Sequence, residues 1–222
     1  MLYHLQAVKD NIRNRDGKRV FYLSDKDRLT NEARDYLCHN RIEILSAKQA
    51  RPERYRLLGG GYLEEKPESM THLSGDILVS KTHPRIAFRG AMDTLEAELL
   101  LCQIHAPGWE QELGQILTLA RRILACEVLE EPCGEQTLCG LTQREIRSHS
   151  HRPQDFYDQP HFMPQASDGE TILRLNRARC AARAAELKAV KAIDQRTDIL
   201  QALNRMSSML YILMIREKAK TR

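Results

Sequence analysis

The chain has 222 residues, of which 42% are hydrophobic, and a formal net charge of +4. This length suits one large domain, or one domain with a small appendage. Because basic and acidic residues are interspersed, a dedicated DNA-binding protein is excluded and no nucleic-acid partner is expected. No apolar run reaches the roughly 18 residues of a membrane span, so no membrane association is expected. The six cysteines lack C-x-x-C spacing, which predicts reduced thiols in a cytoplasmic protein.

Residues 1–82 predict a small α/β region. Residues 19–23 and 41–45 have the composition and alternation of strands, and residues 30–40 between them predict a helix capped by Thr30. Residues 51–68 contain three consecutive glycines and predict a loop. We therefore expect a strand–helix–strand unit followed by a loop.

Residues 83–222 predict a second, helical domain. Apolar residues recur with helical periodicity in four long stretches, at 83–106, 107–131, 171–193 and about 198–216. Long helices with short links favour an up-and-down arrangement. The predicted fold class is therefore mainly α, a four- or five-helix bundle with a small N-terminal α/β region.

Capping boxes are predicted at two helix starts in this domain. Thr142 is followed three residues later by Glu145, and Ser167 is followed in the same way by Glu170. In such a pair each side chain accepts a hydrogen bond from the other residue's backbone N–H group. We expect the first pair to begin a short helix and the second to begin the helix at 171–193.

Two of the predicted helices each carry a polar stripe beside an apolar one. Arg179, Arg183 and Glu186 are spaced i, i+4, i+7 and share one face. The last helix has Gln201, Asn204, Ser208 and Tyr211 on a second stripe. If the stripes meet, guanidinium groups suit phosphate and an amide suits a sugar or a base. Solvated helix faces show the same spacing, and a buried asparagine can serve only to fix helix register. The spacing therefore indicates a candidate cleft but does not identify its ligand.

Several motifs resemble the ATP:corrinoid adenosyltransferases. "ILRLNRARCAARAAE" (172–186) followed by "DILQALNRMSS" (198–208) is similar to the Arg-x-x-x-Arg-x-x-Glu and Asn-Arg-Met-Ser helices of that family. Residues 71–100 resemble its N-terminal pattern, and "SDKDRLTNEARDYL" (24–37) and "HFMPQAS" (161–167) resemble the ethanolamine-utilisation branch. The resemblance covers most of the chain and preserves the order of the motifs.

The resemblance implies a reaction and a setting. Enzymes of this family transfer the 5′-deoxyadenosyl group of ATP to the cobalt of reduced cobalamin and release triphosphate. ATP, Mg²⁺ and cobalamin are the expected ligands, and a homotrimer with ATP near the subunit interface is the expected assembly. An electron-donating reductase and a B12-dependent ammonia-lyase are the expected partners. The expected location is the cytoplasm, with a bacterial microcompartment as the alternative.

The family's nucleotide-site residues carry over by position. Lys81 and Arg183 would hold phosphates, Thr71 would line the phosphate loop, and Asn204 would contact the nucleotide. Arg205 follows Asn204 and points about 100° away from it, which favours a structural or subunit-bridging role.

Further roles are implied for the remaining motif residues. Arg179 would pair with Asp93, and Glu186 would orient the arginines or the ribose. The family displaces the lower axial ligand of cobalamin with an apolar group, for which Phe162 is the candidate, with His161 and Met163 as alternatives.

Two departures from the family pattern leave other interpretations open. Residues 63–73 lack the family's glycine-rich phosphate loop, for which Gly59–Gly61 is a possible substitute, and residues 55–59 lack the cysteines that bind a metal in some ethanolamine-branch members, so no metal site is expected. His149, His151 and His161 could hold a metal, although a surface or cobalamin-facing loop is favoured. The alternative functions are a non-catalytic corrinoid carrier or chaperone, and a helical scaffold of a microcompartment.

Overall fold

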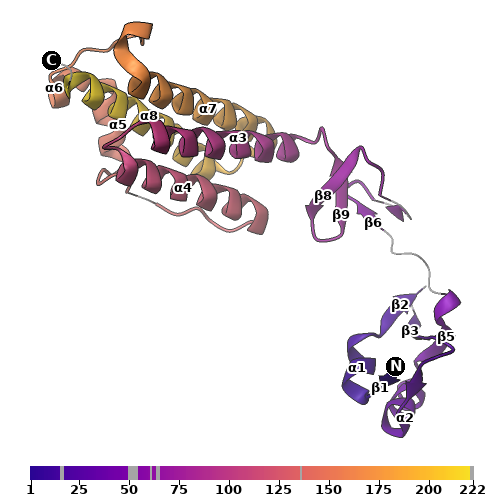
Figure 1. Cartoon of the computed structure of the whole chain (residues 1–222). Helices are drawn as coiled ribbons and strands as arrows, with labels where there is room; N and C mark the ends of the chain where they lie inside the picture. The colour runs from indigo at the N-terminus through magenta and orange to yellow at the C-terminus, as the bar shows by residue number, and fades with distance from the viewer. Residues whose placement is uncertain (16–17, 50–54, 61, 64–65, 136, 221–222) are drawn as a thin grey trace. The chain divides into compact units, whose positions relative to one another are not determined.

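The structure is a computed structural model that describes residues 1–15, 18–49, 55–60, 62–63, 66–135 and 137–220. These residues fall into two compact units, Met1–Lys66 and Pro67–Arg222 (Figure 1). The boundary lies at 66/67, whereas the sequence placed it at 82/83. The intervening hairpin joins the helical unit, because Arg89 Nη1 donates a 2.9 Å hydrogen bond to the carbonyl oxygen of Leu73.

The N-terminal unit contains the predicted strand–helix–strand arrangement. Strands β3 and β5 are parallel and are joined through α2, while β2 is antiparallel to β3 and β1 is parallel to β4. As predicted, Thr30 caps α2, with its Oγ1 accepting from the N–H of Ala33 at 3.3 Å. The elements are β1 (Leu2–Tyr3), α1 (Leu5–Asp10), β2 (Arg13–Arg15), β3 (Lys18–Leu23), β4 (Arg28–Leu29), α2 (Asn31–His39), β5 (Glu43–Ser46), η1 (Ala47–Gln49), β6 (Tyr55–Leu57) and β7 (Tyr62–Leu63).

The loop predicted at 51–68 contains two strands instead. Strands β6 and β7 pair in antiparallel register, with Tyr55 opposite Leu63. Gly60 forms part of a turn, since it has a φ of +96° and its N–H donates to the carbonyl of Leu57 at 3.0 Å. Gly61, the third of these glycines, lies outside the described residues.

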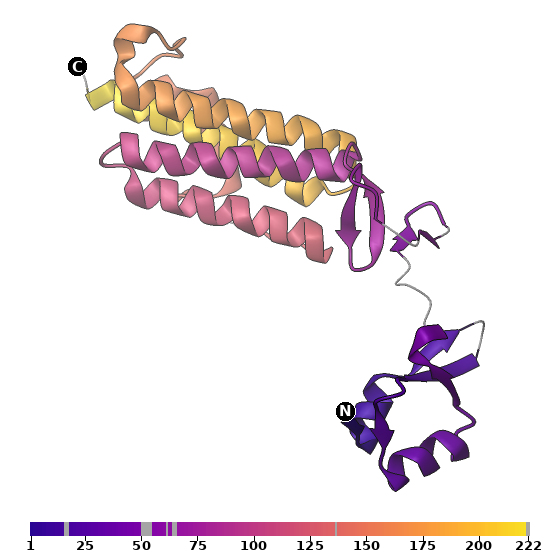
Figure 2. The ribbon, with the colours of Figure 1, turned by 45° about the vertical axis from the view of Figure 1, so that its right-hand side comes forward.

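The second unit is the predicted up-and-down bundle. Its four long helices lie side by side in both views (Figures 1 and 2). Helices α3 and α7 run antiparallel, because Arg177 pairs with Glu98 at 2.7 Å and His105 pairs with Glu170 at 3.1 Å. The elements are β8 (Met70–Ser74), β9 (Ile77–Ser80), α3 (Pro84–His105), α4 (Glu110–Leu129), α5 (Gln143–His151), α6 (Pro153–Tyr157), η2 (Ala166–Asp168), α7 (Gly169–Ile193) and α8 (Thr197–Lys220).

The bundle core follows the apolar stripes of these helices. On α3 the periodic apolar residues from Met92 to Cys102 are fully buried, and on α4 most of those from Leu113 to Leu124 are buried, with Leu124 partly so. Trp109 precedes α4, is 1% exposed and donates from Nε1 to Glu217 of α8 at 2.8 Å. Burial of a continuous apolar face on each helix is what holds the polar stripes in fixed positions on the outside of the bundle. The buried α3 residues are Phe88, Met92, Leu95, Leu99 and Cys102.

The helix starts confirm one predicted capping box and correct the other. The side chains of Thr142 and Glu145 each accept from the other residue's backbone at the start of α5, as predicted. At α7 the box is formed by Gln165 and Asp168 instead, over the short helix η2. Gly169, with a φ of +87°, follows η2 and begins α7, so the predicted pair of Ser167 with Glu170 would span a break in helical geometry.

The hairpin of β8 and β9 lies at the end of the bundle where α3 begins (Figure 2). The two strands pair in antiparallel register, with Thr71 opposite Val79. Gly75 makes the turn with a φ of +53°. Among the described residues, no helix is long and apolar enough to cross a membrane.

Candidate active site

The two predicted polar stripes meet along the contact between α7 and α8. Asn204 Nδ2 donates to Glu186 Oε1 at 3.0 Å, which fixes one edge of the asparagine amide. Arg205 reaches the other edge, since its Nη1 donates to Asn204 Oδ1 at 2.7 Å. The amide is therefore held on both sides, and one N–H of Nδ2 and one lone pair of Oδ1 remain for a ligand.

The two arginines of the α7 stripe have different surroundings. Arg179 is partly buried and donates from Nε and Nη2 to Asn176 Oδ1, at 3.1 Å and 2.9 Å. Arg183 is exposed, and no hydrogen bond or ion pair of its side chain is found within the described part of the chain. A guanidinium without a protein acceptor keeps its donors available to an anion.

The segment before α7 places its aromatic residues against Tyr211, which lies on the polar stripe of α8. His161 Nδ1 lies 3.0 Å from the hydroxyl of Tyr211, and the backbone N–H of Phe162 donates to that hydroxyl at 3.4 Å. The ring of Phe162 stacks near Tyr211, with centroids 6.3 Å apart, and Lys218 Nζ lies 5.9 Å from the Phe162 ring centroid. Tyr211 of α8 therefore anchors this segment beside α7.

A cavity of about 540 Å³ lies where this segment faces the two helices. Its walls include Phe162, His161 and Met163 of this segment, together with Arg179 of α7 and Tyr211 of α8. Apolar, aromatic and cationic side chains thus converge on one hollow, as expected of a ligand site in a helix bundle. Met163 is 84% exposed, whereas Phe162 is partly buried against the bundle.

The structure does not bring the hairpin candidates into contact with this stripe. Thr71 lies in β8, and Lys81 directly follows β9 with its Nζ 4.0 Å from Glu68 Oε2. Asp93 is exposed on α3, and within the described residues Arg179 bonds to Asn176 instead. The single chain therefore brings Phe162 and Arg179 together at the cavity, and Glu186 and Asn204 together at the contact between α7 and α8.

The histidines expected in this region are engaged with aromatic residues and backbone. His149 stacks on Phe156 with centroids 3.8 Å apart, and its Nδ1 lies 2.7 Å from the hydroxyl of Tyr157. His161 Nε2 lies 3.2 Å from the carbonyl oxygen of His151. Over the ranges that the structure describes, no three His, Cys, Asp or Glu residues form a group that could hold a metal ion.

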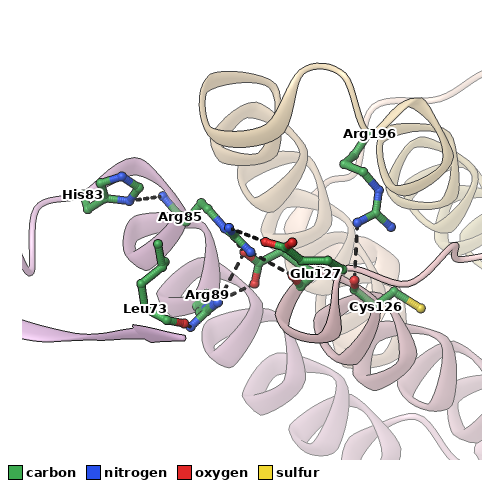
Figure 3. Close-up of polar contacts among 8 residues, drawn as sticks. Leu73, His83, Arg85, Arg89, Cys126, Glu127 and Arg196 are labelled. Carbon is green, nitrogen blue, oxygen red and sulfur yellow. Dashed lines mark hydrogen bonds and ion pairs between the residues drawn. The ribbon is translucent and has the colours of Figure 1, made fainter. Parts of the chain in front are cut away.

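Sequence reasoning missed a buried ionic cluster at the hairpin end of the bundle (Figure 3). Glu127 of α4 is 1% exposed and accepts from Nε of Arg85 and, at 2.7 Å, from Nε of Arg89. Burial acts to lower the pKa of Arg85, but its bonds to Glu127 and Glu130 outweigh that effect and raise the pKa. Since Arg89 also binds the carbonyl of Leu73, the cluster ties the hairpin to α3 and α4.

The comparisons with known proteins agree with this architecture. The sequence profile of the cobalamin adenosyltransferase family matches residues 61–217, and the chain belongs to that family. The match covers β8, β9 and all four long helices, so it includes both polar stripes. The resemblance identified from the motifs is confirmed.

Two curated relatives are similar to the chain over most of its length. The corrinoid adenosyltransferase EutT of Salmonella typhimurium is 36% identical over 163 residues, which are 70% of this chain and 61% of the relative. The corrinoid adenosyltransferase EutT of Escherichia coli (strain K12) is 36% identical over 158 residues, 68% of this chain and 59% of the relative. The chain thus spans about three fifths of the length of the relatives it matches. No solved structure matches it significantly.

Proposed function

We propose that the protein is an ATP:cob(I)alamin adenosyltransferase that serves ethanolamine utilisation. The observation that carries the proposal is the cavity lined by Phe162, His161 and Arg179, on the same two helices, α7 and α8, that bring Glu186 and Asn204 into contact. An apolar and aromatic wall next to a polar stripe suits two substrates, a corrinoid and a nucleotide. The two relatives named corrinoid adenosyltransferase support the same reaction.

The reaction requires little covalent chemistry from the protein. Cobalt of reduced cobalamin attacks C5′ of ATP, the bond from C5′ to oxygen breaks, and triphosphate leaves with its electrons. The leaving group is a polyanion, so the protein must supply positive charge where that charge develops. Arg183, whose guanidinium is exposed on the stripe, and Lys81 are the residues we assign to the phosphates, with Thr71 lining their loop.

The polar stripe would position the nucleotide. Asn204 offers one N–H and one lone pair, because Glu186 and Arg205 occupy its other two positions. An amide with one free donor and one free acceptor matches a ribose hydroxyl or a base edge. Glu186 would then act by holding that amide in place.

The corrinoid would sit against the segment before α7. Phe162 is the residue we assign to displacement of the lower axial ligand, because its ring is apolar and lies near Tyr211, whose hydroxyl accepts from the Phe162 backbone N–H. Both ring nitrogens of His161 are within hydrogen-bond distance of a partner, the Tyr211 hydroxyl and the His151 carbonyl. We therefore assign His161 to positioning the segment that carries Phe162.

Mg²⁺ would arrive with the nucleotide. This ion keeps several waters and is usually held by substrate phosphates with one or two carboxylates. Within the described residues there is no cluster of three acidic, histidine or cysteine side chains to form a cage, and partly buried Glu186 lies on the stripe. The residues present therefore fit an ion carried by ATP, where it would neutralise the triphosphate.

We further propose that the chain acts as a homotrimer. Within the described part of one chain Arg179 bonds to Asn176 and not to Asp93, which is exposed on α3, and we infer that Arg179 and Asp93 pair between two chains. Exposed apolar side chains on the same two helices, such as Ile104 (74%) and Leu187 (72%), favour contacts between copies. An electron-donating reductase and a B12-dependent ammonia-lyase are the proposed partners, in the cytoplasm or in a bacterial microcompartment.

One spectroscopic assay tests the proposal. The protein is mixed with ATP, Mg²⁺ and chemically reduced cobalamin, and the visible spectrum is followed for adenosylcobalamin. Formation above the rate without protein is the expected result. Tight cobalamin binding without turnover would favour a corrinoid carrier over an enzyme. The absence of both binding and turnover would reject both functions.

A further inference from the structure

A second cavity, of about 480 Å³, lies between α5, the segment before it and the N-terminal half of α8. It is separate from the cavity at Phe162, and the two share no lining residue. Three arginines line it, Arg144 and Arg147 from α5 and Arg205 from α8, against a single carboxylate from Glu135. Its volume is many times the roughly 30 Å³ that one water occupies in the liquid, so it can hold a polyatomic ligand.

None of the three arginines forms an ion pair among the residues that the structure describes, although Glu135 lines the same cavity. Other arginines of this unit are paired: Arg85 and Arg89 with Glu127, and Arg196 with Asp198 at 2.9 Å. Three like charges around one hollow repel one another unless a negative group enters.

Arg205 is the one of the three arginines with a buried donor that lacks a hydrogen-bond partner among the described residues. Its Nη1 donates to Asn204, but its buried Nε has no hydrogen-bond partner within the described part of the chain. Burial, reinforced by the nearby charge of Arg147 and opposed by Glu186, lowers the pKa of Arg205. A negative ligand in the cavity would reduce the repulsion among the arginines and would compensate the buried positive charge of Arg205.

We propose that this cavity is a binding site for phosphate-class anions and takes a polyphosphate chain. Phosphoryl oxygens match the forked donors of guanidinium groups, and a chain of phosphates can contact several arginines at once. The choice of a polyphosphate rests on the proposed function, because Arg205 links the cavity to Asn204, the residue assigned to the nucleotide. Its arginines would contact the phosphates in place of the glycine-rich loop, which this sequence lacks.

Direct binding of inorganic triphosphate, measured by calorimetry without cobalamin or Mg²⁺, tests the site. The double variant Arg144→Ala/Arg147→Ala removes two exposed side chains of the cavity and leaves Asn204 and Arg205 intact. Its affinity should fall at least about tenfold, the scale of losing a charge-assisted contact. The matched control, Arg34→Ala/Lys188→Ala, removes two exposed charges elsewhere and should bind like the unmodified protein.

An ATP titration of the same proteins separates the two sources of phosphate. If the double variant weakens ATP and triphosphate together, the cavity holds the tail of the bound nucleotide. If it weakens triphosphate alone, the cavity holds the released anion. Both results support the site, whereas equal triphosphate affinity of the double variant and the unmodified protein, or no triphosphate binding at millimolar concentration, overturns it. A failed adenosylation assay with intact arginine-dependent triphosphate binding would remove the proposed function and leave the site.

Discussion

Arg183 is the residue whose charge the proposed reaction needs most directly. Its side chain is exposed on the stripe that carries Glu186 and Arg179, so Arg183→Ala should leave the fold intact. We expect turnover in the adenosylcobalamin assay to fall by about one to three decades, the range for losing one preorganised electrostatic contact. Lys188→Ala removes an exposed cation from another face of α7 and should retain full activity. Equal turnover rates for the two variants would contradict the assignment of Arg183 to the phosphates.

Glu127 is the residue on which the ionic cluster at the hairpin end depends. Glu127→Ala would remove the buried carboxylate that Arg85 and Arg89 share, and each of these arginines is less than a fifth exposed. We expect the free energy of unfolding to fall by about 3 kcal/mol, the scale of breaking a buried pair from one side. Urea unfolding followed by Trp109 fluorescence measures this loss, because Trp109 is the sole tryptophan and is buried in the helical unit.

Glu130→Ala is the matched control for that experiment. Glu130 also pairs with Arg85, at 3.1 Å, but its side chain is 72% exposed. Exposed ion pairs contribute about 1 kcal/mol or less. If the two variants lose the same free energy, burial is not what makes the Glu127 cluster strong.

At the scale of elements, Arg196 and Asp198 fasten the turn between α7 and α8. Asp198 accepts from Arg196 and, at 2.8 Å, from the backbone N–H of Cys133, while Arg196 reaches the carbonyls of Cys126 at 3.3 Å and Glu131 at 2.7 Å. Figure 3 shows the contact of Arg196 with Cys126. The turn is thereby tied to the end of α4.

The pKa of Asp198 makes this contact sensitive to acid. Hydrogen bonds from Arg196 and from the backbone N–H of Cys133 lower the pKa of Asp198, against the opposing effect of burial. A lowered folded-state pKa adds stability above the unfolded value of about 3.9 and loses it as pH falls toward the folded value. Asp198→Asn should therefore cost about 1–2 kcal/mol at pH 7 and progressively less below pH ~4. Urea unfolding of the variant and of the unmodified protein from pH 7 to pH 3 checks this, and a difference between the two that does not change with pH would contradict it.

The segment before α7 is the element that would contact the corrinoid. Phe162→Ala removes the ring beside Tyr211, and we expect turnover to fall by at least about tenfold, equivalent to 1.4 kcal/mol of barrier. The visible spectrum of bound cobalt(II) cobalamin should also keep the signature of an intact lower ligand. Met163→Ala, at a side chain that is 84% exposed, is the control. A larger effect at Met163 than at Phe162 would exchange their roles.

Periodicity predicted the helices well because each buries one continuous apolar face, as in the stripe from Met92 to Cys102. It missed the hairpin of β8 and β9, although "THLSGDILVS" (71–80) has two strand-like runs around a Gly-Asp turn. Glu127 could not be found from local sequence, because its burial is set by Arg85 and Arg89, 42 and 38 residues earlier. The stripes left open whether Asn204 and Glu186 meet, and they did not indicate that Arg205 would hold the same amide.

At the scale of the whole molecule, the two compact units have separate apolar cores. The core of the second unit runs from Phe88 to Met214, and the first unit has its own core around Phe21 and Leu37. A unit with its own core can in principle fold alone. The family match begins at residue 61, so it leaves most of the first unit outside.

A fragment of residues 67–222 should therefore keep the folded bundle. We expect its free energy of unfolding, reported by Trp109 fluorescence, to lie within about 1 kcal/mol of the value in the full chain, no more than an ordinary point mutation changes it. Glu127→Ala should destabilise fragment and full chain equally, because every residue of that cluster lies in the second unit. If the fragment unfolds at much lower urea, or if the Glu127 effect differs between them, the first unit contributes to the stability of the bundle and the two cores are not independent.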